Sequence, residues 1–107
     1  MRREQAIADC LLAIEVELRT LGWWESQAPT AQALASSQPF CVDTLRFEQW
    51  LQWVFLPKMK QLLEQGAVPA GNSAITEMGE VAFAGQAQQT ASLLDWLRKF
   101  DQQFKGD

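Results

Sequence analysis

The segment from Phe47 to Met59, FEQWLQWVFLPKM, constrains the fold of this 107-residue chain more than any other part of the sequence. Its large apolar side chains are too numerous for the single apolar stripe that a surface helix buries. Pro57 lies within the same helical pattern, where it removes a backbone N–H and disfavours a regular helix. Because the apolar residues project on two sides, we expect a central helix that is covered by more than one neighbour.

Two further long helices are predicted by apolar residues that recur at steps of three and four. The first covers residues 4–21, and Gly22 is placed to end it in a left-handed conformation. The second covers residues 86–104 and repeats the same spacing. The apolar seams are Ile7, Leu11, Ile14, Leu18 and Leu21 in the first helix and Leu93, Leu97, Phe100 and Phe104 in the second.

The remaining segments are predicted to complete the central helix and to form two short ones. Either Asp43 or Thr44 is expected to cap the central helix, which Gly66 ends. Short helices are predicted over residues 29–35, with proline at the first helical position, and over residues 75–84.

The sequence therefore predicts an all-α fold, a small antiparallel helical bundle of three long and two short helices. No segment shows the sustained alternation that is typical of a strand. We expect one domain over residues 1–107, which is long enough to bury a core. The apolar fraction of 48% and the charged fraction of 21% are those of an ordinary globular protein.

Composition disfavours several classes of function. Nine basic and 13 acidic residues give a net charge of −4, whereas a nucleic-acid-binding surface needs clustered Lys and Arg. Without histidine, the chain cannot form a Ser-His-Asp triad, and it has no imidazole to bind a metal. Its two cysteines are too few for a structural zinc site. We expect a protein that is not an enzyme and holds neither a metal nor another cofactor.

The sequence also favours a cytoplasmic protein that does not contact a membrane. Acidic residues interrupt the apolar stretch near the N-terminus, unlike the apolar region of a signal peptide. No apolar run approaches the roughly 20 residues that cross a bilayer. Cys10 and Cys41 are expected to be reduced and partly buried, although their spacing alone leaves a disulfide open.

Five tryptophans in a chain without tyrosine are the feature that these arguments leave unexplained. Tryptophan is enriched where proteins bind proteins, but small bundles also use indole rings to fill the core. Trp23, Trp24 and Trp53 fall outside the best apolar seams, and Leu56 and Met59 project away from the main face of the central helix. We interpret these five residues as a candidate surface for another protein or for a second copy of the chain.

Two other functions stay open. An accessory factor that touches RNA would use the densest basic residues, and its binding of tRNA would weaken steeply with added salt. A bundle that binds a small molecule would contain an apolar cavity among the aromatic residues of the core. The basic residues are Arg2, Arg3, Lys58 and Lys60, and the cavity would be lined by Trp50, Phe55 and Phe100.

A set of short motifs runs through the middle of the chain: ALAS at 33–36, PF at 39–40, DTL at 43–45, and FEQWLQWVF at 47–55 with Pro57 and Met59 after it. These motifs resemble the YqcC-like family of small bacterial proteins. The resemblance implies an all-α bundle and a bacterial cytoplasmic protein, and it brings no catalytic residues. Members lie in gene neighbourhoods that encode a tRNA pseudouridine synthase, which implies an accessory role near tRNA modification. The acidic net charge favours contact with a protein over contact with tRNA in such a role.

Overall fold

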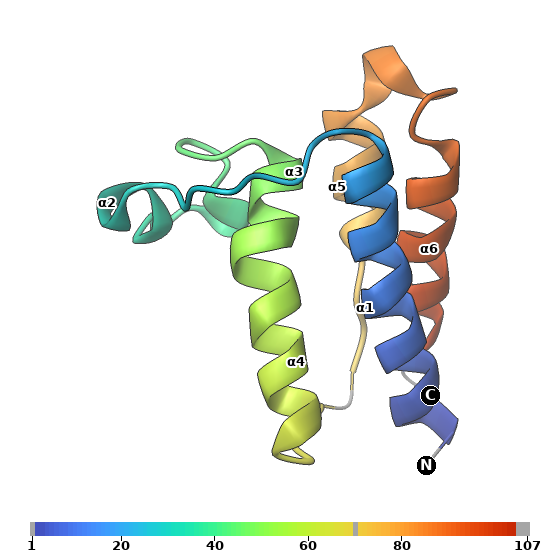
Figure 1. Cartoon of the computed structure of the whole chain (residues 1–107). Helices are drawn as coiled ribbons and strands as arrows, with labels where there is room; N and C mark the ends of the chain where they lie inside the picture. Colours follow the sequence, from blue (N-terminus) through green and yellow to red (C-terminus); the bar gives the residue numbers. More distant parts are fainter. Residues whose placement is uncertain (1, 70, 105–107) are drawn as a thin grey trace.

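The computed structural model describes residues 2–69 and 71–104, except for the side chain of residue 2, and this part of the chain contains helices and no strands. Three long helical elements pack with the short helix Ile75–Ala82, while the short helix Ala31–Leu34 lies to one side and has no buried residue (Figure 1). The predicted all-α bundle is confirmed. None of the described helices is both long and apolar enough to cross a membrane. The elements are α1 (Arg2–Thr20), α2 (Ala31–Leu34), a 3₁₀ turn (Pro39–Cys41), α3 (Phe47–Trp50), a π-helical turn (Leu51–Phe55), α4 (Leu56–Glu64), α5 (Ile75–Ala82), a second 3₁₀ turn (Ala84–Gln86) and α6 (Ala91–Gln102).

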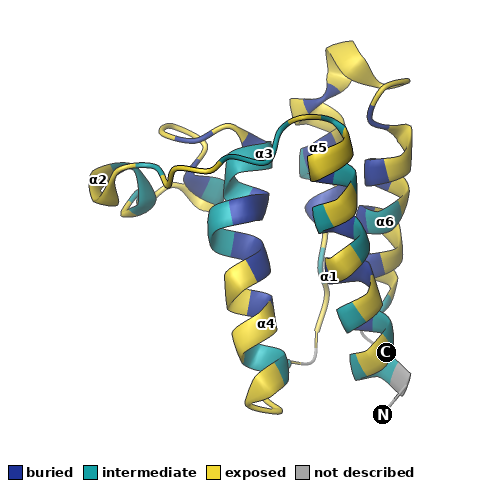
Figure 2. Ribbon diagram, in the orientation of Figure 1, coloured by how far each residue is buried: buried dark blue, intermediate teal, exposed yellow. Residues whose placement is uncertain are grey.

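Helix α1 lies between α4 and α6 and contacts both (Figure 1). Its predicted seam is almost fully buried, and buried positions alternate with exposed ones along the helix (Figure 2). This pattern is that of a helix with one side on the core. The seam residues that are at most 2% exposed are Ile7, Leu11, Ile14 and Leu18.

Helices α1 and α6 run antiparallel to each other. At one end, the hydroxyl of Ser92 donates a hydrogen bond to Glu17 at 2.8 Å. At the other end, the guanidinium of Arg3 donates to the carbonyl of Gln103 at 2.9 Å. These contacts join the first and last helices of the bundle along their whole shared length.

Gly22 ends the first helix in a left-handed conformation, with φ of +78°, as the sequence predicted. The N–H of Trp23 then donates to the carbonyl of Leu18 at 2.9 Å, which satisfies one of the last carbonyls of the helix. Residues 23–30 continue past the top of α3 to α2 (Figure 1), and we call this segment the strap.

The start of α3 differs from the prediction, because neither Asp43 nor Thr44 caps it. The carboxylate of Asp43 accepts a hydrogen bond from Ser36, and the hydroxyl of Thr44 donates to the carbonyl of Ala33 at 2.7 Å. Both side chains therefore hold the preceding loop. The helix begins at Phe47, and the amide oxygen of Gln49 accepts the N–H of Arg46 at 2.8 Å.

Two other helix starts also lie later than predicted. Thr30 caps α2 by accepting the N–H of Ala33 at 3.1 Å, so Pro29 precedes that helix instead of opening it. Helix α6 begins at Ala91, because residues 84–90 form a 3₁₀ turn and further turns. The buried hydroxyl of Thr90 donates to the carbonyl of Gln86 at 2.8 Å within these turns.

A π-helical turn, and not a break in the helix, accommodates Pro57. The N–H of Leu56 donates to the carbonyl of Leu51, five residues earlier, so the turn before the proline contains one extra residue. In a regular α-helix the proline ring would clash with the carbonyl of Trp53. Helices α3 and α4 therefore continue as one element through the π-helical turn (Figure 1).

The same turn changes which side chains face the core. One extra residue sets all later side chains back by roughly one step, about 100° around the axis. Leu56 and Met59 therefore join the face of Leu51 and Phe55, and they are only 1% and 8% exposed. The prediction that Leu56 and Met59 form apolar surface outside the core is wrong, because it placed these residues by a constant 100° per residue, which the π-helical turn changes.

The two cysteines are buried free thiols. Burial raises the pKa of the Cys10 thiol, the nearby carboxylate of Asp9 raises it further, and the ammonium of Lys99 opposes both effects in part. A raised thiol pKa lowers the fraction of reactive thiolate. Cys10 is a core residue of α1, and its thiol is less reactive than an exposed one.

Candidate protein-binding site

Three of the five residues predicted to bind a partner line one shallow groove between the strap and α4. Trp24 comes from the strap, Trp53 from the π-helical turn, and Leu56 from the start of α4. The groove has a volume of about 400 Å³. Its full lining is Trp24, Glu25, Ser26, Gln52, Trp53, Leu56, Pro57 and Lys60, and we call it the Trp24–Trp53 groove.

The structure separates Trp23 from its neighbour in the sequence. The ring of Trp23 packs on Phe83, with 5.3 Å between the centroids, and so contributes to the contact between the strap and the end of α5. Trp24 instead lies under Arg19, whose Cζ atom is 4.5 Å from the ring centroid. Both indoles are half-buried, but only Trp24 lines the groove.

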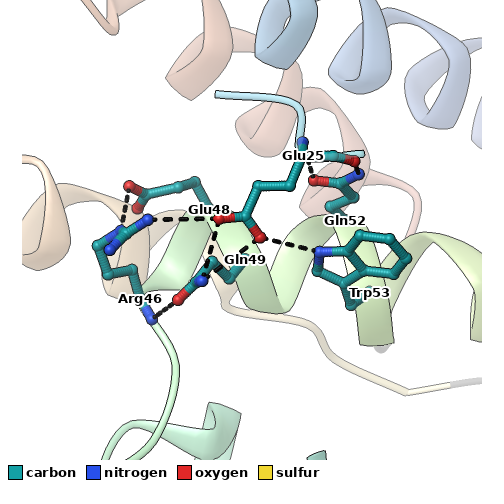
Figure 3. Close-up of polar contacts among 6 residues, drawn as sticks. All are labelled: Glu25, Arg46, Glu48, Gln49, Gln52 and Trp53. Atoms are coloured by element: carbon teal, nitrogen blue, oxygen red, sulfur yellow. Dashed lines mark hydrogen bonds and ion pairs between the residues drawn. The ribbon is translucent and has the colours of Figure 1, made fainter. Parts of the chain in front are cut away.

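Glu25 fastens the strap to the central helix (Figure 3). Its carboxylate accepts the indole N–H of Trp53 at 3.1 Å and the side-chain amide of Gln49 at 3.2 Å. The guanidinium of Arg46 lies 3.5 Å from the same carboxylate. These contacts fix the Trp53 ring along one wall of the groove. The ring therefore helps to hold the strap on the central helix, and it also lines the groove.

Gln52 makes a second connection to the same strap residue. Its side-chain oxygen accepts the backbone N–H of Glu25 at 2.8 Å, and its side-chain N–H donates to the Glu25 carbonyl at 2.7 Å (Figure 3). Gln52 is 5% exposed, so its amide replaces the water that would otherwise satisfy this backbone. The floor of the groove is therefore rigidly joined to the strap.

Sequence reasoning did not find Glu25 or Gln52. A polar residue beside the apolar face of the central helix is the one signal that could have drawn attention to Gln52, because buried amides need partners. Nothing near Glu25 in the sequence identifies its partners, since they lie 21 to 28 positions later along the chain.

One edge of the groove is charged. Lys60 lies 3.4 Å from the carboxylate of Glu15 on α1, and Arg19 lies 3.0 Å from it. Burial by itself raises the pKa of Glu15, but the hydrogen bonds and charges of Arg19 and Lys60 outweigh it and hold the pKa below its ordinary value. The carboxylate is therefore ionised at neutral pH, and Lys60 at the edge of the groove is paired with it.

The basic residues of the RNA hypothesis do not all remain available. Arg3 donates to the carbonyls of Gln103 and Pro69, and its guanidinium lies over the ring of Phe104. Lys60 is paired as described above, while Lys58 is exposed. The side chain of Arg2 lies outside the described part of the chain.

The aromatic residues of the small-molecule hypothesis pack directly on one another. The rings of Trp50 and Phe55 stack with centroids 5.5 Å apart, and those of Phe55 and Phe100 meet edge to face at 4.9 Å. Phe55 and Phe100 are almost fully buried. The space where a cavity was predicted is filled by these rings.

Comparison with known proteins identifies the family. The sequence model of the DUF446 family, described as tRNA pseudouridine synthase C, matches residues 6–103. This chain belongs to the DUF446 family. The predicted resemblance to YqcC-like proteins is also confirmed: the uncharacterized protein YqcC of Escherichia coli is 36% identical over 97 residues, which cover 91% of this chain and 89% of YqcC.

The fold of the DUF446 chain is shared with a solved structure. The solution NMR structure of YqcC from E. coli superimposes with a TM-score of 0.84 at 34% identity and covers 97% of this chain and 89% of that one. The helical arrangement, including the central helix that carries the groove, therefore corresponds to a known fold.

Two further relatives match over part of their length. An uncharacterized protein of Haemophilus influenzae is 39% identical over 69 residues, or 64% of this chain and 65% of that protein. A tRNA pseudouridine synthase C of Pectobacterium carotovorum is 44% identical over 64 residues, or 60% of this chain. The match spans only 17% of that protein, so most of its length has no counterpart in this chain.

Proposed function

We propose that this protein is a non-enzymatic helical module that binds the tRNA pseudouridine synthase C of the same cell, and that the Trp24–Trp53 groove is the contact surface. The observation that carries the proposal is the match with the Pectobacterium carotovorum protein of that name. The segment related to this chain makes up 17% of the length of that protein. In E. coli, by contrast, the relative is a separate protein of about this length. A covalent link keeps two modules at a high effective concentration, and a module that is a separate protein needs its own contact surface to reach the same partner.

The chemistry of the groove supports a binding role without catalysis. The chain has no histidine to act as a general base, and the carboxylate of Glu25 and the ammonium of Lys60 are both engaged in contacts within the protein. The accessible apolar groups are the ring of Trp24 and the surfaces of Trp53 and Pro57. Tryptophan held rigidly beside a groove is typical of the residues that dominate protein interfaces.

A binding titration with purified proteins tests this proposal. The synthase C encoded in the same genome should bind the chain with a Kd in about the micromolar range or below. Ser26→Arg places a bulky side chain at the exposed rim of the groove and should weaken binding at least about tenfold. Ser37→Arg is the matched control, because it adds the same side chain at another exposed loop position.

The competing RNA function is tested with the same material. Binding of a tRNA transcript that is detectable at low salt and falls steeply with added salt would support direct RNA contact. Binding of the synthase without tRNA, weakened by Ser26→Arg and unaffected by Ser37→Arg, would support the module proposed here. Absence of binding to the synthase, or equal weakening by both variants, would contradict it.

A further inference from the structure

The outer face of α1 carries a second apolar surface, next to the groove. Leu12 and Val16 are 64% and 51% exposed and lie one helical turn apart, so they form adjoining apolar surface. They border a shallow depression of about 440 Å³ with Trp96 of α6. The depression is lined by Asp9, Leu12, Ala13, Val16, Glu17 and Trp96, and we call this surface the α1 stripe.

Acidic side chains stand at both ends of the α1 stripe. The lining positions on α1 follow the spacing of a single helix face, with Asp9 at one end and Glu17 at the other. Asp9 accepts a hydrogen bond from Gln5, and Glu17 accepts one from Ser92. These donors are neutral, so they leave the negative charge of each carboxylate in place.

Two basic side chains adjoin the stripe: Lys99 on α6, and Arg19 on α1, which is paired with Glu15. The ammonium of Lys99 lies 4.1 Å from the centroid of the Trp96 ring. Asp9, Glu17 and Lys99 together carry a net charge of −1, and the charges of Arg19 and Glu15 balance each other. The stripe therefore combines an apolar centre with a negative border, and it is complementary to a basic segment that has an apolar centre.

A second copy of this chain fits the α1 stripe poorly. Two stripes packed face to face would bring Asp9 or Glu17 of one copy against the same carboxylates of the other. Like charges opposed across an interface weaken it. A basic partner meets no such repulsion.

The stripe and the Trp24–Trp53 groove are neighbouring surfaces. Leu12, Glu15, Val16 and Arg19 follow the spacing i, i+3, i+4 and i+7, which places them on one side of α1. Glu15 contacts Lys60 at the edge of the groove, and Arg19 covers Trp24. A single partner laid across α1 can therefore touch both surfaces.

We propose that the α1 stripe binds a basic segment with an apolar centre on the synthase, so that the interface extends from the groove across α1. This inference rests on the function proposed above. A protein that binds tRNA must expose clustered Lys and Arg, which gives the synthase a surface of the required charge. Leu12 and Val16 supply the apolar contact area, and the carboxylates of Asp9 and Glu17 favour a basic partner.

Two pairs of variants test the proposal by titration against the purified synthase. Leu12→Ser with Val16→Ser should weaken binding at least about tenfold. The control, Val42→Ser with Val81→Ser, changes two equally exposed valines elsewhere and should alter the Kd less than about threefold. Asp9→Lys with Glu17→Lys should also weaken binding at least about tenfold. The control, Glu64→Lys with Glu77→Lys, makes the same change in net charge at positions outside the α1 stripe and should weaken binding less.

The outcomes separate this proposal from the one on which it rests. If the wild-type chain does not bind the synthase, both proposals are overturned. If it binds and Ser26→Arg weakens the complex, but either stripe pair binds like its control, the stripe proposal fails and the module proposal stands. Circular dichroism of every variant checks that the fold is kept, as expected for substitutions at accessible positions.

Discussion

The carboxylate of Asp101 on α6 caps the first turn of α5 through Thr76. One oxygen accepts the N–H of Thr76 at 2.9 Å and its hydroxyl at 2.6 Å. The other accepts the N–H of Ile75 at 3.2 Å and the hydroxyl of Ser73 at 2.7 Å. The first amides of a helix lack partners within it, and the N-cap residue here is Ala74, which has no side-chain oxygen. A neighbouring helix therefore supplies the cap.

We expect Asp101→Ala to lower the free energy of unfolding by about 2–3 kcal/mol, because two amides and two hydroxyls lose their acceptor. Urea unfolding followed by circular dichroism measures the change. Asp95→Ala on the same helix is the control, since that carboxylate makes an exposed pair with Arg98 and should contribute less than about 1 kcal/mol. Equal losses in the two variants would show that the cap does not stabilise α5.

Leu56→Ala should destabilise the protein by about 2–5 kcal/mol, since the side chain is 1% exposed and its removal leaves a cavity. The matched substitution Leu12→Ala removes a leucine that is 64% exposed and should cost less than about 0.5 kcal/mol. Thermal and urea unfolding of both variants provide the comparison. If Leu56→Ala unfolds with the same free energy as wild type, the Leu56 side chain lies on the surface. That result would contradict the rotation of later side chains toward the core that the π-helical turn produces.

Gln52→Leu keeps most of the side-chain volume but removes both hydrogen bonds to the backbone of Glu25. We expect a loss of about 1–3 kcal/mol, because the partly buried N–H and carbonyl of Glu25 lose their partners. The Glu25 amide hydrogen should also exchange faster with solvent, because the strap loosens locally. Gln61→Leu, at an exposed position of α4, is the control. Unchanged exchange at Glu25 would mean that Gln52 does not hold the strap.

The helices that could be predicted from the sequence are those with a strong local signal. The seam of the first helix and the glycines at positions 22 and 66 are local features. Gly22 adopts the predicted left-handed conformation, and Gly66, predicted as the end of the central helix, also has a positive φ. The start of α3 was missed because Asp43 and Thr44 bind atoms of the preceding loop instead. A side chain that could cap a helix does so only if no competing partner takes it.

The candidate site was predictable only where its residues carry a local signal in the sequence. Trp24 and Trp53 could be singled out because they fall outside the regular apolar seams, and they do line one groove. The burial of Leu56 and Met59 could not be foreseen from a projection at a constant 100° per residue, since the π-helical turn changes the phase. Pro57 is the local sign that such a change was needed.

The pH dependence of stability should reveal the two ion pairs of Glu15. Arg19 and Lys60 hold the pKa of this carboxyl below its ordinary value, despite the opposing effect of burial. Because the folded-state pKa is lower than the unfolded-state pKa, the stabilisation is complete above the unfolded value and is lost as the pH falls through the folded one.

Glu15→Gln should therefore reduce the free energy of unfolding at about pH 7, and the difference from wild type should shrink as the pH falls below about 5. Urea unfolding at several pH values across this range measures the difference. Glu64→Gln, an exposed glutamate on α4, is the control and should follow the wild-type pH dependence more closely. The assignment fails if the difference between Glu15→Gln and wild type is the same at every pH, because a stabilising contact of the ionised carboxylate must disappear when that carboxylate is protonated.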